Sequence, residues 1–276
     1  MNIDKVVDDI KDFMLEAGTF ALKNQKNVGT SFKDGNQIVT ETDLAISALI
    51  KDKLSYWLDK KNNILIDEES INLSPSQVFG NSEYQWVLDP IDGTAGYALG
   101  RNMWGISLAV LHNGLPLVGS IYMPAMGEIF IADENRSYKI NINNGTEEEI
   151  QTVKMDVNSQ VFVESFFGGD IRWGKKDFSR DKIWLNIPES AVQGFTSMLT
   201  NKAAASTFIT GYSIWDIAGA MALAKNTEYK ILSMEDGSEW AQFSADKFKD
   251  NWKLDTNWLL THPDNFNYIS KALKGC

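Results

Sequence analysis

The segment Asp-Pro-Ile-Asp-Gly-Thr at 89–94 places two carboxylates three positions apart, directly after the apolar run at 85–88. This run predicts a short buried strand that delivers Asp89 and Asp92 to its carboxyl-terminal end. Hard divalent cations such as Mg²⁺ prefer oxygen ligands of this kind. The glycine permits a tight turn and Thr94 stands where a helix could begin, so free backbone amides, which suit a phosphate, are expected there. One turn therefore offers both halves of a metal-assisted phosphate site.

Two further acids stand at similar junctions between an apolar element and a turn. Glu68 follows a short strand predicted at 64–66, and Asp216 is the second residue of an Ala-rich apolar helix predicted over 215–224. A bare carboxylate in such a place is costly unless it is paired or bound to a metal. Each acid alone also fits a structural role, Glu68 as a solvated strand exit and Asp216 as a first-turn acid favoured by the helix dipole.

The remaining patterns predict a mixed α/β chain in two halves. Apolar spacing predicts helices over 4–24, from Thr42 to 58, over 189–202 and over 264–274. Strands are predicted at 106–111 and 115–122, joined through Asn113-Gly114 as a hairpin, and at 127–132, 161–163, 206–209, 229–233 and 258–261. Loops are expected around 75–81 and 168–180. The polar stretch 141–158 is the best boundary, so we predict subdomains at 1–145 and 146–276, with Asp216 and the substrate pocket in the second.

The bulk properties exclude several classes of function. A net charge of −11 argues against a surface for a nucleic-acid polymer. No apolar run is long enough to cross a bilayer, and the first residues lack the layout of a secretory signal. The only cysteine is Cys276, so no disulfide framework exists. A cytoplasmic protein without a membrane partner is therefore expected.

Three segments together resemble the inositol monophosphatase-like family, the Mg²⁺-dependent, lithium-sensitive phosphatase superfamily. They are Asp-Glu-Glu-Ser at 67–70, the segment at 89–94, and Trp-Asp-Ile-Ala-Gly-Ala at 215–220. Their order and approximate spacing are those of the family, and Thr40-Glu41-Thr42-Asp43 matches its upstream aspartate. The resemblance covers nearly the whole chain and thins between about 134 and 188. It implies an αβαβα sandwich of the inositol monophosphatase and fructose-1,6-bisphosphatase type, and a homodimer.

The resemblance also implies hydrolysis of a small phosphorylated metabolite, a phosphate monoester, by a metal-activated water with two or three Mg²⁺ ions. Glu68, Asp89 and the backbone carbonyl of Ile91 would hold one Mg²⁺. Asp89, Asp92 and Asp216 would hold a second, so that Asp89 bridges the two. Paired cations of this kind stabilise both the attacking and the leaving oxygen of an in-line displacement.

The catalytic groups implied by the resemblance lie beside these ligands. Asp43, hydrogen-bonded to the Thr94 hydroxyl, would orient or deprotonate the water, and Glu68 would act beside them. Substrate and phosphate would be bound by Gly93, Thr94, Ala95 and Asp216.

The chain departs from the family on the substrate side. An acidic residue that grips sugar-like hydroxyls in the family falls here at Ile209, and the family's Gly-Ser/Thr-Ala-Ala segment is replaced by 187–192. The substrate therefore stays open between inositol monophosphate, sugar phosphates, fructose-1,6-bisphosphate, histidinol phosphate and 3′(2′),5′-bisphosphate nucleotides. A catalytically weak or inactive protein that binds a phosphometabolite is the alternative. A basic cluster could meet a second phosphate, although a solvated loop is the simpler interpretation; it comprises Arg172, Lys175, Lys176 and Arg180.

Overall fold

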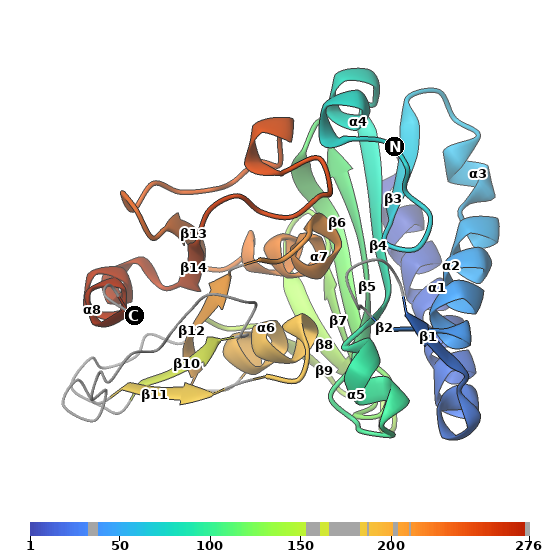
Figure 1. The fold of residues 1–276 in the computed structure, drawn as a ribbon, viewed down its shortest axis with the longest axis horizontal. Helices are drawn as coiled ribbons and strands as arrows, with labels where there is room; N and C mark the ends of the chain where they lie inside the picture. Colours follow the sequence, from blue (N-terminus) through green and yellow to red (C-terminus); the bar gives the residue numbers. More distant parts are fainter. Residues whose placement is uncertain are drawn as a thin grey trace.

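The protein is a five-layered α/β sandwich (Figure 1). Helices α1 (Ile3–Asn24) and α2 (Glu41–Lys53) cover the outer face of a seven-stranded sheet. Helices α6 (Ala191–Thr200) and α7 (Ile214–Ala224) lie between this sheet and a five-stranded one, and α8 (Pro263–Leu273) lies outside the second sheet. The predicted αβαβα architecture is therefore confirmed. The computed structural model describes residues 1–32, 38–152, 161–165, 183–186, 188–200, 204–209 and 211–273.

The seven-stranded sheet follows the chain in order. It consists of β3 (Asn63–Asp67), β4 (Tyr84–Asp92), β5 (Gly105–His112), β6 (Leu115–Met123), β7 (Glu128–Ala132), β8 (Ser137–Asn141) and β9 (Glu147–Glu149). Only β3 and β4 pair in parallel. The hairpin predicted between β5 and β6 is confirmed, because Asn113 and Gly114 both have positive φ angles, of 50° and 78°.

The five-stranded sheet is mixed, and its order requires crossovers. It runs β11 (Ile183–Asn186), β10 (Val161–Ser165), β12 (Ala204–Ile209), β14 (Trp258–Thr261), β13 (Lys230–Ser233). Strand β14 is antiparallel to both of its neighbours, whereas β10 is parallel to both of its own. The remaining elements are β1 (Thr30–Phe32), β2 (Ile38–Thr40), α3 (Ser55–Leu58), α4 (Pro75–Asn81), α5 (Thr94–Ala98), η1 (Gln25–Asn27) and η4 (Ala245–Lys247).

Helix α7 packs unusually closely on the seven-stranded sheet, and this brings the start of the helix to β4. A Cβ atom added at Gly219 would lie 2.6 Å from Ser107 Oγ, and one added at Gly119 would lie 2.4 Å from Ala222 Cβ. Glycines on both surfaces thus allow the backbones to approach. One buried hydrophobic cluster fills the space between the two sheets, and another lies between α1, α2 and the outer face of the larger sheet.

Some sequence-based expectations are wrong in detail. The strand expected to end before Asp89 continues through Asp92. The expected loop at 75–81 is helix α4, because Ser74 and Gln77 form a capping box in front of Pro75. The helix expected from 42 to 58 is divided into α2 and α3 at Leu54. Strand β11 was not predicted. The two-subdomain division stays a prediction, and the loop at 168–180 with its basic cluster lies outside the described residues.

None of the helices in the described part of the chain is both long and apolar enough to span a membrane.

Candidate active site

A bulge in β4 places the two aspartates of the central motif on the same side of the sheet. In the pairing with β5, Asp89 is opposite Ser107 and Asp92 is opposite Gly105, so three steps on β4 match two on its partner. Side chains alternate along a regular strand, and residues three apart would face opposite sides. The extra residue reverses that parity. Pro90 is compatible with the bulge because it has no N–H to pair.

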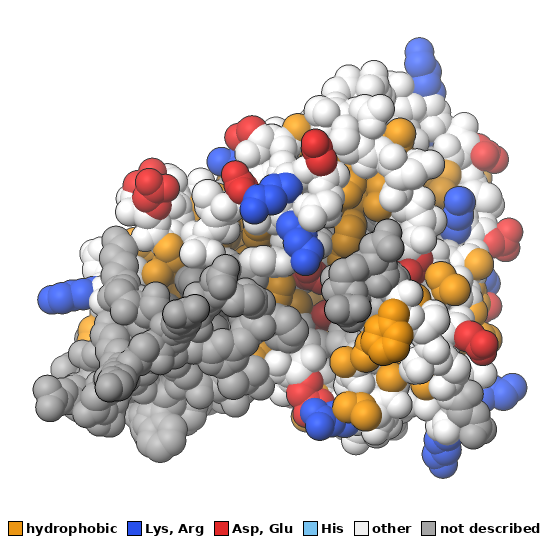
Figure 2. Space-filling view, viewed as in Figure 1, with side chains coloured by type: hydrophobic (Ala, Val, Ile, Leu, Met, Phe, Trp, Pro, Cys, Tyr) orange, Lys and Arg blue, Asp and Glu red, His pale blue; other side chains and the backbone are white. Residues whose placement is uncertain are grey.

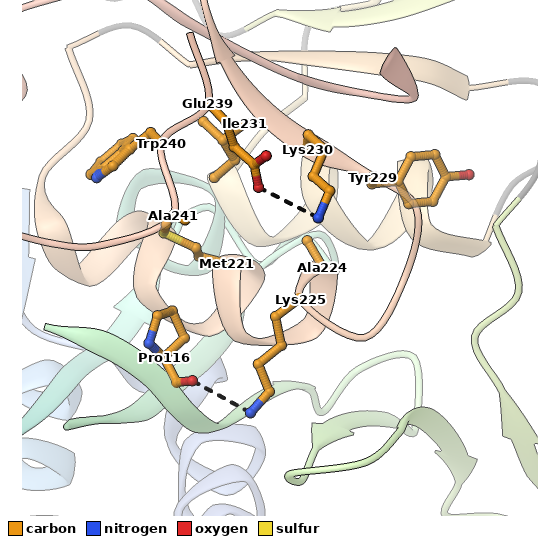
Figure 3. A pocket seen from close by; sticks show the side chains of 10 residues that line it. All are labelled: Pro116, Met221, Ala224, Lys225, Tyr229, Lys230, Ile231, Glu239, Trp240 and Ala241. Atoms are coloured by element: carbon orange, nitrogen blue, oxygen red, sulfur yellow. Dashed lines mark hydrogen bonds and ion pairs between the residues drawn. The ribbon is translucent and has the colours of Figure 1, made fainter. Parts of the chain in front are cut away.

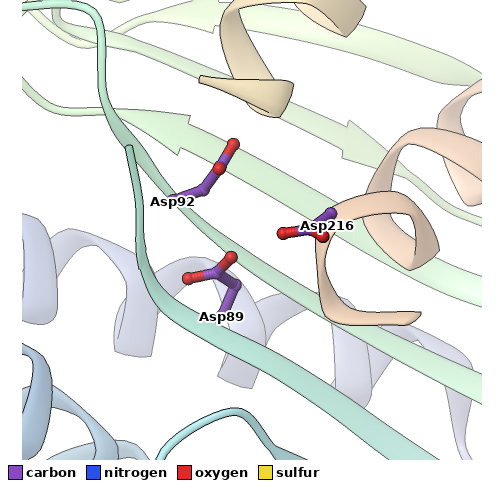
Figure 4. Close-up of side chains that lie close together, drawn as sticks. All are labelled: Asp89, Asp92 and Asp216. Atoms are coloured by element: carbon purple, nitrogen blue, oxygen red, sulfur yellow. The ribbon is translucent and has the colours of Figure 1, made fainter. Parts of the chain in front are cut away.

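Asp216 joins these two aspartates from the first turn of α7. Carboxylate oxygens of Asp89, Asp92 and Asp216 all lie within 4.8 Å of one another. Figure 4 shows the two strand residues and the helix residue directed into one shared space. In the space-filling view, acidic side chains are visible at the bottom of a hollow on this face (Figure 2). The acids predicted to form the second metal site are therefore brought together.

In two of the three carboxylates, a backbone N–H group holds one oxygen in place. In the third, one oxygen has no hydrogen-bond partner among the described residues. Asp216 Oδ2 accepts a hydrogen bond from the N–H of Ser213 at 2.6 Å. Asp92 Oδ2 accepts one from the N–H of Val192, at the start of α6. Asp89 is 1% exposed, and its Oδ1 has no hydrogen-bond partner among the described residues. A buried carboxylate oxygen without a hydrogen-bond partner is suited to coordinate a cation.

Burial and mutual repulsion raise the pKa of all three carboxyl groups. The pKa of Asp89 lies well above its usual value because of burial and the charges of Glu68 and its other acidic neighbours. The pKa of Asp216 is raised by burial and by Asp92 and Glu68. Burial raises the pKa of Asp92 to about 6, although backbone N–H groups, that of Val192 foremost, oppose the rise. A divalent cation would relieve this concentration of negative charge.

Glu68 lies in the turn that follows β3, and this turn is held by its buried neighbour Asp67. Asp67 Oδ2 accepts hydrogen bonds from Ser47 Oγ at 2.5 Å and Ser70 Oγ at 2.6 Å, and its Oδ1 accepts one from the N–H of Glu69 at 3.2 Å. The charge of Glu68 acts on both Asp89 and Asp216. The fourth predicted acid is therefore close enough to the cluster to influence it electrostatically.

Asp43 and Thr94 form the hydrogen-bonded pair that the family resemblance implied. Thr94 Oγ1 lies 3.2 Å from Asp43 Oδ1 and 3.0 Å from the carbonyl oxygen of Ile91, and can donate to either. The other carboxylate oxygen of Asp43 accepts hydrogen bonds from the N–H and hydroxyl of Thr40, the N-cap of α2. The capping box thus fixes Asp43, which is 1% exposed, in the position that reaches Thr94.

Gly93 makes the sharp turn between the bulged strand and α5. Its φ angle of +88° belongs to the left-handed region, and an added Cβ atom would lie 2.7 Å from Ser190 Cβ. Both conditions require glycine. Helix α5 begins at Thr94, as the sequence predicted, so the backbone amides of 93–95 lie at a helix start beside the acidic cluster.

On the substrate side, Ile209 is completely buried in the core cluster that also contains Phe195 and Trp258, and its place in the substrate pocket stays a prediction. The segment before α6 lies beside α5, because a Cβ atom added at Gly96 would lie 3.5 Å from Glu189 Oε2. Arg101, just after α5, pairs with Glu189 Oε1 at 3.1 Å, while Glu189 Oε2 is buried and has no partner among the described residues.

The fold and this cluster of buried acids are consistent with a single protein family. The family model for the inositol monophosphatase family matches residues 10–247, and the chain therefore belongs to that family. Its relatives in this comparison include proteins named as phosphatases and a nucleotidase, which supports phosphate-ester hydrolysis at the level of the family. Others carry the names Nus factor SuhB and quinic acid degradation cluster protein x.

The curated relatives align with parts of the chain. A 3′(2′),5′-bisphosphate nucleotidase CysQ of Buchnera aphidicola is 28% identical over 49% of this chain, which spans about half (51%) of that protein's length. A fructose-1,6-bisphosphatase/inositol-1-monophosphatase of Thermotoga maritima is 27% identical over 71% of this chain and 70% of its own length.

Solved structures match over almost the full chain. An inositol monophosphatase of Thermotoga maritima superposes with a TM-score of 0.76 at 21% identity, covering 98% of this chain and 96% of the other. An IMPase/NADP phosphatase crystallised with Mg²⁺ and phosphate gives 0.78 at 15% identity, covering 100% and 97%. At these identities, the likeness establishes the fold.

Proposed function

We propose that this protein is a Mg²⁺-dependent phosphatase that hydrolyses the phosphate monoester of a small phosphorylated metabolite. The observation that carries the proposal is the convergence of Asp89, Asp92 and Asp216, with a buried oxygen on Asp89 that has no hydrogen-bond partner in the described part of the chain. This donor set consists of oxygen atoms only, which fits Mg²⁺. The inositol phosphates and related sugar or nucleotide phosphates are the substrate classes that the family suggests.

The ligands that we assign follow the positions of the acids. Asp89, Asp92 and Asp216 would hold one Mg²⁺, and Glu68 with Asp89 and the carbonyl oxygen of Ile91 would hold another. A bound Mg²⁺ supplies charge stabilisation for the phosphoryl oxygens and makes a water nucleophilic at neutral pH.

The protein's own groups would orient the attacking water. When Thr94 donates its hydroxyl proton to Asp43, its oxygen keeps lone pairs that can accept a hydrogen bond from that water. Asp43 is held by two hydrogen bonds from Thr40, so its carboxylate is already oriented before the water binds. The proton released by the water would move toward Asp43 through Thr94.

The phosphate would lie at the start of α5, where the backbone amides of Gly93, Thr94 and Ala95 are directed out of the helix. Asp216 would contact the substrate from the opposite side as well as the cation. A homodimer and inhibition by lithium, both taken from the family resemblance, and a cytoplasmic location, which rests on the bulk properties of the sequence, complete the proposal.

An inactive phosphometabolite-binding protein remains the second candidate, because the segment before α6 departs from the family. A phosphate-release assay separates the two. We expect turnover of at least one monoester in a panel of inositol, sugar and nucleotide phosphates with Mg²⁺, and none with EDTA. Ligand binding without turnover of any monoester would favour the inactive protein.

Asp89→Asn provides the sharpest test of the metal assignment. It removes the ligand that both cations would share, so hydrolysis should become undetectable. Asp59→Asn, at an exposed aspartate after α3, is the matched control and should keep wild-type turnover. Unchanged turnover in Asp89→Asn would show that the metal assignment is wrong.

A further inference from the structure

A large cavity adjoins the acidic cluster, because Glu68 and Trp215, the neighbour of Asp216, line it. Its volume is about 620 Å³, and it is lined by three segments that are distant in the sequence. These are the turn from Glu68 to Gln77, the first turn of α7 at Trp215, and the loop at 250–252. Because Glu68 and the neighbour of Asp216 belong to its wall, the cavity opens directly beside the groups that would hold the cations.

One residue in the wall of this cavity, Trp252, has an unusual backbone conformation. Trp252 has a φ angle of +66°, in a region that bulky side chains rarely adopt. Its ring is 3% exposed, contacts Phe79 and Phe248, and donates a hydrogen bond from Nε1 to the carbonyl oxygen of Leu73 at 2.9 Å. Strain of this kind persists where the surroundings hold it in place, often near functional sites.

The same loop is also attached to the segment before α7. The N–H of Leu254 donates to the carbonyl oxygen of Tyr212 at 2.8 Å, and Lys253 forms a β-bridge with Ser213. The loop is therefore anchored on both sides of the cavity, to the turn after β3 and to the start of α7. A preformed cavity of this kind binds a ligand at a lower entropic cost than a collapsed one.

Several polar groups of the lining keep free hydrogen-bonding capacity. Asn72 and Asp250 make no side-chain hydrogen bond within the described part of the chain. Gln77 uses its Oε1 atom to cap α4 and Asn251 uses its Oδ1 atom for the N–H of Lys253, so both retain free NH₂ groups. These amides and the carboxylate can bind hydroxyl groups or the edge of a heterocyclic base.

The charges in the cavity argue against a second phosphate. Its described lining contains two acids, Glu68 and Asp250, and neither Lys nor Arg, although the charge of Lys253 acts on Asp216 nearby. The lining itself therefore supplies no counter-charge for a second phosphate. The apolar side chains of the lining are Ile71, Leu73, Trp252 and Trp215, which is half-buried.

We propose that this cavity binds a neutral ring with hydrogen-bonding groups at its edge, packed with one face against Trp215, as part of the alcohol of the phosphate ester. A planar nucleobase or a puckered sugar ring satisfies this chemistry, and a second phosphate group does not. The inference deepens the proposed function and rests on it for the identification of the ring as part of the substrate.

A smaller cavity at the other end of α7 shows no comparable sign of a ligand site (Figure 3). Its volume is about 160 Å³, and its charged groups have partners within the protein. Lys225 donates to the carbonyl oxygens of Pro116 and Leu117, and Lys230 pairs with Glu239 at 3.4 Å.

The test compares kcat/KM for three Mg²⁺-supported substrates: adenosine monophosphate, a hexose phosphate and glycerol phosphate, which has no ring. In Trp215→Ala, the ratio of a ring-bearing substrate to glycerol phosphate should fall about tenfold, as expected from lost stacking. Trp215→Phe should restore most of the ratio. A fall with the nucleotide alone identifies a base site, and a fall with the hexose phosphate alone identifies a sugar site. Unchanged ratios for both would overturn the proposal.

A charge reversal at the exposed rim is the second variant. Asp250→Lys should raise kcat/KM for adenosine 3′,5′-bisphosphate relative to adenosine monophosphate about tenfold, because it introduces the missing counter-charge. Asp52→Lys, the same change at an exposed position of α2, is the matched control and should leave that ratio unchanged. Equal ratios in the two variants would contradict the assignment of Asp250 to the site.

Calorimetric titration with adenosine and with ribose distinguishes a failure of this inference from a failure of the proposed function. If no monoester is hydrolysed but either probe binds the wild type about tenfold more tightly than Trp215→Ala, the ring site stands and the phosphatase assignment fails. If esters are hydrolysed and neither probe binds in a Trp215-dependent manner, the ring site is refuted.

Discussion

The buried acids predict that removing one negative charge makes the metal-free protein more stable. Burial raises the pKa of Asp92 from 3.8 to about 6, so the ionised form costs the folded state about 3 kcal/mol at 1.36 kcal/mol per pH unit. A raised carboxyl pKa contributes stability below the unfolded-state value and loses it as the pH rises through the folded-state value. The metal-free protein should therefore lose stability between about pH 4 and pH 6 and remain at the lower level at pH 8.

Asp92→Asn removes this cost while it keeps the size of the side chain. Its carbonyl oxygen can still accept the hydrogen bond from the N–H of Val192. In EDTA at pH 8, the variant should be about 3 kcal/mol more stable than the wild type, which corresponds to about 6–12 °C in Tm for a chain of this size. At pH 4 the advantage should disappear. Thermal and urea unfolding, followed by tryptophan fluorescence, measure both differences.

Mg²⁺ should reverse the order of the two proteins. At pH 8 the wild type gains stability from the bound cation, whereas Asp92→Asn lacks a ligand and gains less. Asp59→Asn should follow the wild type under all conditions. If metal-free Asp92→Asn is less stable than the wild type at pH 8, the reasoning is refuted, because the carboxylate would then stabilise the fold.

Three further changes test the support of the site. If the hydroxyl orients the water, Thr94→Ala should lower kcat about 100-fold and Thr94→Ser should restore it. Steady-state kinetics measure both values of kcat. Gly93→Ala should destabilise the protein by at least about 1–2 kcal/mol, because of its positive φ angle and the closeness of Ser190, and a urea melt that matches the wild type would contradict this. Asp67→Asn should cost about 1–3 kcal/mol through its weakened hydrogen bonds and raise the Mg²⁺ concentration needed for half-maximal activity; an unchanged Mg²⁺ titration would separate Asp67 from the placement of Glu68.

The local patterns of the sequence were sufficient to predict where the acids stand. Glu68 follows an apolar strand, and Asp216 stands in the first turn of an apolar helix. The periodicity of both elements is clear from the sequence, and the structure places both acids at these junctions. The hairpin between β5 and β6 has an Asn-Gly turn that specifies its geometry. In these places local chemistry and the tertiary structure agree.

The bulge that aligns Asp89 and Asp92 could not be predicted in the same way. Its existence depends on the register with β5, and a one-residue change in register would move a side chain to the other face. Likewise, the contact between Asp92 and Val192 joins residues 100 positions apart. Both features depend on how distant elements pair and pack.

The cavity beside Glu68 illustrates the same limit on the substrate side. Trp252 belongs to a loop without helical or strand periodicity, and only its contacts with Leu73, Phe79 and Phe248 show why it is held in a strained conformation. Three of the four acids that we assign to the cations lie on β4 and α7, whose positions are fixed by close backbone packing. Apart from Trp215 on α7, the cavity wall consists of the segment 68–77 and the loop at 250–252, which can change in sequence without disturbing those two elements. Substrate preference can therefore change within this fold while the acidic cluster is retained, which is why a family match predicts the reaction class more readily than the substrate.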